Sequence, residues 1–204
     1  MSRMQRFFVR FLLLYALLNL CLLLCACSTS WVTEAEGIIA ALTPAVQGIL
    51  VLLASLGAAI APAVISSIQS WGEQAQNDLQ NVVLPLIQQY NTAETTAQPG
   101  ILTEISTAMA TIVNGLTSIL PSLHIDDPAT QLKVQDVVTE VADEMQALLN
   151  LIPVIKGATS PADALRALAA HPEVVTKLKS EKQFKKDYNA KIALCGTQFK
   201  NWIK

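Results

Sequence analysis

The feature that most constrains how this chain can fold is a run of 36 residues, Gly37–Gly72, without one charged side chain. Its centre at 46–68, VQGILVLLASLGAAIAPAVISSI, is apolar around most of its circumference if it forms a helix. A surface of that kind must be removed from water, because its exposure is unfavourable. The segment therefore belongs in the middle of a helical bundle or in a membrane, and its composition permits both.

Residues 44–68 carry features that support each alternative. As a helix the segment rises about 1.5 Å per residue, which is long enough to cross a hydrocarbon layer of about 30 Å. Small residues in the segment would let two such helices approach closely. These residues are Ala54, Gly57, Ala58 and Ala61. Polar residues and a proline interrupt the apolar surface and favour the bundle core: Gln47, Ser55, Pro62, Ser66 and Ser67.

The rest of the chain shows helical periodicity rather than the alternation of strands. Apolar residues recur three or four positions apart in three later segments: 75–90, 101–119 and 134–152. This spacing places them on one face of an α-helix. The sequence therefore predicts an all-α fold, an irregular helical bundle of about five to seven helices that follows an N-terminal signal segment.

Prolines and polar residues predict where these helices begin and end. Thr43 followed by Pro44 is typical of an N-cap and the first helical residue, and Asp127 stands before a proline in the same way. Pro85 is expected to kink its helix, because it lacks a backbone N–H. The polar stretch 91–100, NTAETTAQPG, is expected to be a loop.

Four carboxylates accompany the cleanest apolar stripe, that of residues 134–152. They fall outside its apolar positions and are expected on a solvated face: Asp136, Glu140, Asp143 and Glu144. No histidine lies at a spacing suitable for a shared metal ion. The sequence therefore predicts neither a metal site nor an acid–base pair on this helix.

Residues 173–204 are predicted to form a basic amphipathic C-terminal helix with an aromatic face. Apolar residues recur every three or four positions: Phe184, Tyr188, Ile192, Cys195, Phe199 and Ile203, with Trp202 beside them. Such a helix can lie in a membrane interface and attract anionic lipid, or it can bind an envelope protein. It can equally pack on the bundle with its lysines in water. The candidate contacts to a membrane or partner are Phe184, Tyr188, Phe199, Trp202, Lys185 and Lys186.

The sequence predicts no catalytic activity and no cofactor. It contains no Gly-rich phosphate loop, no nucleophile elbow and no two-histidine metal motif. Its two histidines, His124 and His171, each lie beside a predicted turn. Without the arginines of the first ten residues, 11 basic side chains stand against 16 acidic ones. This net charge of about −5 argues against nucleic acid as the main partner.

The first 26 residues have the pattern of a secretory signal peptide. Arg3, Arg6 and Arg10 precede the apolar run FLLLYALLNLCLLLCA at 11–26. A basic start, a short apolar core and a small residue at the end are the three parts of such a signal. The run is somewhat short for a stable membrane span, which needs about 20 residues. An uncleaved membrane anchor is the alternative interpretation.

The end of this run, Leu24-Cys25-Ala26-Cys27, resembles the lipobox of bacterial lipoproteins. The resemblance implies that Leu24 and Ala26 are recognition positions for the signal peptidase. It implies that Cys27 becomes the first residue of the mature chain and carries fatty chains such as palmitate. Ser28 after the cysteine implies sorting to the outer membrane, facing the periplasm, in a Gram-negative host. The resemblance covers residues 1–28 and indicates a processing class, not an activity.

These interpretations divide the chain into four parts: a signal peptide at 1–26, a lipidated tether at 27–36, a helical bundle at 37–172 and the basic helix at 173–204. The leading hypothesis is a lipid-anchored helical protein of the bacterial cell envelope with a structural or binding role. The alternative is a membrane-active protein, pore-forming or holin-like, that inserts residues 44–68. A third hypothesis is an enzyme without a readable motif.

Overall fold

The computed structural model describes residues 30–57, 60–158 and 161–204. Within these ranges every regular element is a helix and none is a strand, which confirms the predicted all-α bundle. The predicted signal peptide and the predicted lipobox residues Leu24, Ala26 and Cys27 lie outside the described residues.

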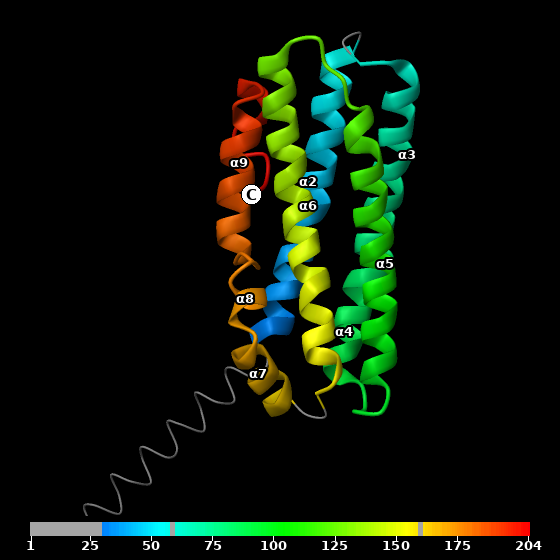
Figure 1. The fold of residues 1–204 in the computed structure, drawn as a ribbon, viewed down its shortest axis with the longest axis vertical. Helices are drawn as coiled ribbons and strands as arrows, with labels where there is room; N and C mark the ends of the chain where they lie inside the picture. Colours follow the sequence, from blue (N-terminus) through cyan, green and yellow to red (C-terminus); the bar gives the residue numbers. More distant parts are fainter. Residues whose placement is uncertain (1–29, 58–59, 159–160) are drawn as a thin grey trace, which may run out of the picture.

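Four long helical units form the bundle and run alternately up and down (Figure 1). The second unit is continuous from α3 through one π-helical turn into α4. The units are α2 (Ser30–Leu56), α3–α4 (Pro62–Asp78, Leu79–Val83 and Leu84–Thr92), α5 (Gln98–Ile119) and α6 (Pro128–Lys156).

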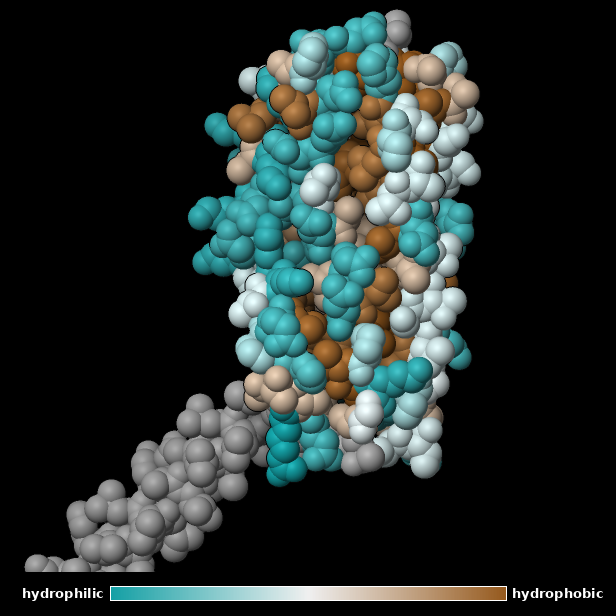
Figure 2. Space-filling model, viewed as in Figure 1, coloured by the Kyte–Doolittle hydropathy of each residue, from teal (hydrophilic) through white to brown (hydrophobic). Residues whose placement is uncertain are grey.

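The C-terminal part packs on one side of this bundle. Two short helices, α7 (Pro161–Ala170) and α8 (Pro172–Val175), lie at the end where α2 begins, and α9 (Glu181–Ala193) then runs along α6 (Figure 1). α9 contacts both α2 and α6. Hydrophilic residues gather over α9, whereas apolar residues reach the surface in the seam between α6 and α5 (Figure 2).

α2 is the core helix, and it contains residues 37–56, the larger part of the segment without charged side chains. It contacts α3, α4, α6 and α9, so neighbours surround it on most sides. Its largest fully buried side chains are Ile38, Ile39, Leu42, Ile49 and Leu52. Each such side chain stabilises the folded state by about 1.5–3 kcal/mol when it leaves water. The bundle-core alternative therefore describes residues 30–56 in this structure.

The apolar segment 44–68 is not one helix. α2 ends at Leu56, Gly57 follows with a φ of 46°, and α3 begins only at Pro62. A positive φ is the conformation in which helices commonly terminate, and glycine adopts it without a steric penalty. The chain thus reverses its direction between α2 and α3, which are antiparallel (Figure 1).

Two predicted boundaries at the start of the bundle are wrong. The expected tether at 27–36 is already helical from Ser30, and the ring of Trp31 packs edge-on against Tyr90 at 5.2 Å between centroids. Pro44 lies inside α2 rather than at a helix start. Apolar residues on both sides of Pro44 face the same core, and this packing outweighs the local start signal.

Later boundary predictions fare better. The carboxylate of Asp127 accepts the backbone N–H of Thr130 at 2.9 Å, so Asp127 is the N-cap of α6 as predicted. A π-helical turn at 79–83 precedes Pro85, which lies at the start of α4. The expected loop at 91–100 shortens to five residues, 93–97, because α5 already begins at Gln98.

The predicted C-terminal helix ends early and folds back on α2. α9 stops at Ala193, and the chain then turns through a short 3₁₀ helix at 197–199. The hydroxyl of Tyr188 donates to the carbonyl of Ala45, and the indole N–H of Trp202 donates to that of Pro44, both at 2.7 Å. These two hydrogen bonds hold the end of the chain against the middle of α2.

Gly48 makes this close approach feasible. A methyl group at Gly48 would collide with the Tyr188 hydroxyl and lie 2.8 Å from the Trp202 indole nitrogen. We predict that Gly48→Ala lowers the free energy of unfolding by about 1–3 kcal/mol, the usual cost of overpacking. Gly100→Ala is the matched control, because nothing lies within 4 Å of the added methyl group. It should raise stability by about 0.5–1 kcal/mol. Urea unfolding of both variants tests this, and equal effects would refute the close-approach argument.

Candidate functional site

The aromatic residues proposed as membrane or partner contacts lie inside the protein. Phe184, Tyr188 and Phe199 are fully buried, and Trp202 is half-buried. Burial raises the pKa of the Tyr188 phenol above its usual value, so the hydroxyl stays protonated and donates to α2. The packing alternative therefore describes the aromatic face of this segment, and that face is not available to a membrane.

The two lysines named with them differ from each other. Lys185 pairs with Glu181 one turn earlier, at 2.5 Å, whereas Lys186 is exposed to solvent. Cys195 is half-buried among apolar neighbours, as expected of a small apolar residue, and burial raises the pKa of its thiol. A raised pKa lowers the thiolate fraction and hence the reactivity of this cysteine.

Two carboxylates of α6 are buried, contrary to the predicted solvated face. Glu140 is 4% exposed and Glu144 is 1% exposed, whereas Asp136 and Asp143 are indeed exposed. Glu140 binds the ammonium groups of Lys179 and Lys191, the latter at 2.6 Å. The prediction failed for these two residues because α9 covers the side of α6 that carries them.

Glu144 sits deeper than Glu140, and no ammonium group of the described residues pairs with it. Its carboxylate accepts the backbone N–H of Lys179 at 3.1 Å. Burial raises the pKa of the Glu144 carboxyl to about 7, against which the hydrogen bond from Lys179 acts. Asp187 on α9 completes the group through the Lys179 ammonium, at 3.0 Å. We call Glu140, Glu144, Lys179, Asp187 and Lys191 the α6–α9 charge cluster.

The charge cluster joins α6 to α9 and the connection before it. Every buried side-chain nitrogen or oxygen in the described part of the chain has a hydrogen-bond partner. Buried ion pairs add little net stability, because desolvation offsets the attraction, but an unpaired charge there is costly. The cluster therefore fixes how the connection before α9 sits on α6. No group of three or more metal-ligating side chains occurs among the described residues.

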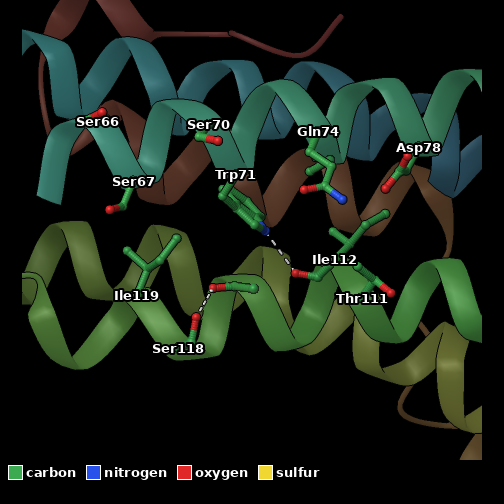
Figure 3. Close-up of a pocket in the computed structure, with 12 residues that line it drawn as sticks. Ser66, Ser67, Ser70, Trp71, Gln74, Asp78, Thr111, Ile112, Ser118 and Ile119 are labelled. Carbon is green, nitrogen blue, oxygen red and sulfur yellow. Dashed lines mark hydrogen bonds between the residues drawn. The ribbon is translucent and has the colours of Figure 1, made fainter. Parts of the chain in front are cut away.

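A polar groove of about 480 Å³ runs between α3 and α5 (Figure 3). Trp71 forms its floor, and the indole N–H donates to the carbonyl of Ile112 at 2.9 Å. Ser67 and Ser118 lie along its walls, and their hydroxyls donate to backbone carbonyls of their own helices. Small side chains on two facing helices explain this hollow. The hydrogen bonds of Ser67, Trp71 and Ser118 all go to backbone carbonyls of the two helices.

A second hollow, of about 560 Å³, lies at the end of the bundle where α2 begins. We call it the basal groove. It lies between the first turn of α2, the last turns of α6, helices α7 and α8, and the connection to α9, and its walls are mainly apolar. Its volume is within the range of about 300–1,000 Å³ that is typical of small-molecule sites. The basal groove was not predictable from the sequence, because its walls come from four helices and one connection.

Comparisons with protein-family models, curated proteins and solved structures found no match for this chain.

The charge cluster predicts a pH dependence of stability. Folding raises the pKa of Glu144 from 4.5 to about 7. The contribution of this carboxyl group to the stability of the folded state is therefore fully present below pH 4.5 and is lost as the pH rises through 7. Glu144→Gln stays neutral throughout. We predict that its stability relative to the unsubstituted protein rises by about 2–3 kcal/mol between pH 5 and pH 8.

Urea unfolding at several pH values measures this difference. Asp143→Asn, at the exposed carboxylate one residue earlier, is the matched control for the loss of one negative charge. A constant difference between the Glu144→Gln variant and the unsubstituted protein across this range would show that Glu144 does not titrate in the folded state.

Proposed function

We propose that this chain is a lipid-anchored helical protein of the bacterial cell envelope with a structural or binding role. The observation that carries the proposal is the lipobox-like sequence directly before a bundle that buries its own apolar helix. A cysteine acylated at position 27 would hold the bundle at a membrane from one end. More than one acyl chain is needed for stable anchoring, at about 0.8 kcal/mol per buried methylene.

The position of the anchor sets how the bundle is presented. Cys27 precedes the first described residue of α2 by three positions, and a fully extended chain spans at most about 3.6 Å per residue. The end of the bundle with α7 and α8 would therefore stay close to the membrane. The opposite end, with the α2–α3 and α5–α6 connections, would point away from it and be the more accessible to a partner (Figure 1).

The membrane-active alternative draws support from α2. Trp31–Leu56 is long and apolar enough to cross a membrane, but 56% of the most apolar stretch of 18 residues within it is buried inside the protein. Core helices of soluble proteins and signal segments pass the same test of length and composition. Insertion of α2 would also expose the faces of α3, α4, α6 and α9 that now cover it. We therefore place this alternative second.

Mass spectrometry of the protein from its native host tests the anchor. We predict a mature chain that begins at Cys27 and carries the mass of acyl chains on that residue. Cys27→Ala should abolish both the acylation and the cleavage, leaving residues 1–26 attached. Cys195→Ala is the matched control at the other cysteine of the mature chain, and it should be processed like the unsubstituted protein. An unmodified Cys27 in a chain that still begins at Met1 would refute the proposal.

A protease site inserted between Ser28 and Ser30 distinguishes the lipid-anchored protein from the membrane-active alternative. In the lipid-anchored protein, cleavage of isolated membranes should release residues 30–204 into the soluble fraction, because no other part enters the bilayer. If the cleaved bundle resists extraction with alkaline carbonate, α2 is inserted and the membrane-active alternative is correct.

A further inference from the structure

The basal groove is an apolar hollow that the fold itself leaves uncovered. Its walls come from Trp31, Leu151, Leu168, Pro172, Val175 and Leu178. Val175 remains 40% exposed, and Leu168 and Leu178 are half-buried. Apolar surface gathered in one concave place is unfavourable in water and marks a site for an apolar ligand.

The charged residues beside the groove are already engaged within the protein. Glu34 accepts the backbone N–H of Glu181 at 2.5 Å. The ammonium group of Lys179 belongs to the α6–α9 charge cluster, where it binds Glu140 and Asp187. Neither group is therefore available to pair with a charged ligand headgroup, and the walls select for the apolar part of a ligand.

The short distance along the chain from Cys27 to Trp31 would keep an acyl chain on Cys27 close to this groove. Trp31 is part of the wall, and Cys27 precedes it by four residues. Four residues span at most about 14 Å, so any group on the Cys27 thiol is attached close to the groove. A tether this short gives an effective concentration on the order of millimolar or above.

We propose that the basal groove holds one of the acyl chains attached to Cys27 of the same molecule. This inference rests on the lipidation in the proposed function. An acyl chain is long, narrow and uncharged, which suits a concave apolar groove, whereas a bilayer surface is broad and would meet the rim of the groove rather than its walls. The chain exchanges one apolar environment for another, so its free-energy difference between groove and membrane is small.

The consequence is a protein with two states of its anchor. With every acyl chain in the bilayer, anchoring is strongest. With one chain in the groove, each methylene withdrawn from the bilayer weakens the anchoring, and that chain is shielded from water when the protein is outside a membrane. The groove thus assists passage of the lipidated protein through an aqueous compartment.

Photocrosslinking in the living host tests the occupant. Cells are fed palmitic acid that carries a diazirine and are then irradiated, and the purified protein is mapped by peptide mass spectrometry. We expect the label on Cys27 and crosslinks from it to peptides of α7, α8 and the connection to α9 in the same chain.

A matched pair of variants shows whether the groove is responsible. Ala169 lines the groove and Ala170 does not, and both are exposed at the end of α7. Ala169→Phe fills the groove without removing a core contact and should abolish the intramolecular crosslinks. Ala170→Phe adds the same ring one position further along and should leave them unchanged.

The other outcomes are distinguishable. An unlabelled Cys27 would refute the proposed function itself. A labelled Cys27 that crosslinks only to phospholipid or other proteins, or crosslinks insensitive to Ala169→Phe, would overturn the groove assignment and leave the lipid anchor intact. A second arm adds vesicles of diazirine-bearing phosphatidylethanolamine to unlabelled protein. Equal crosslinking of the groove in that arm would make a bilayer lipid the occupant instead.

Discussion

The structure depends on removing from water one helix, α2, that is uncharged over most of its length. α2 carries no charged side chain between Gly37 and its end, so it is stable only where other helices cover it. α3–α4 and α6 supply two sides of that cover, and α9 with the residues after it supplies a third. The amphipathic character of the later helices follows from this task, because each presents an apolar stripe to the core and a polar face to solvent.

Fold class was predictable from the sequence, because the apolar periodicity of 101–119 and 134–152 is long and regular. Local signals were less reliable. Asp127 is the N-cap it was predicted to be, whereas Pro44 is not at a helix start, since burial on both sides of it outweighs one missing N–H. The N-cap of α6 is exposed to solvent, so local hydrogen bonds determine it. The position of Pro44 depends on the packing of the whole core.

The buried carboxylates show what periodicity alone does not reveal. Glu140 and Glu144 lie one turn apart on a second stripe of α6 that continues through Ala147 and Leu151. The stripe is visible in the sequence, and the excess of lysines near the C-terminus is the matching signal. Only the placement of α9 on α6 brings the glutamates and the lysines together, and these contacts join residues 35 or more positions apart. The two grooves were unpredictable for the same reason.

The hydrogen bonds from Tyr188 and Trp202 to α2 have a consequence for biogenesis. Ribosomes make a chain from its amino end, so α2 is synthesised well before residues 188–202, which complete its cover. A nascent chain cannot complete this core until residues 188–202 have been made. Until then the core of the bundle stays open on the side that α9 and the residues after it cover.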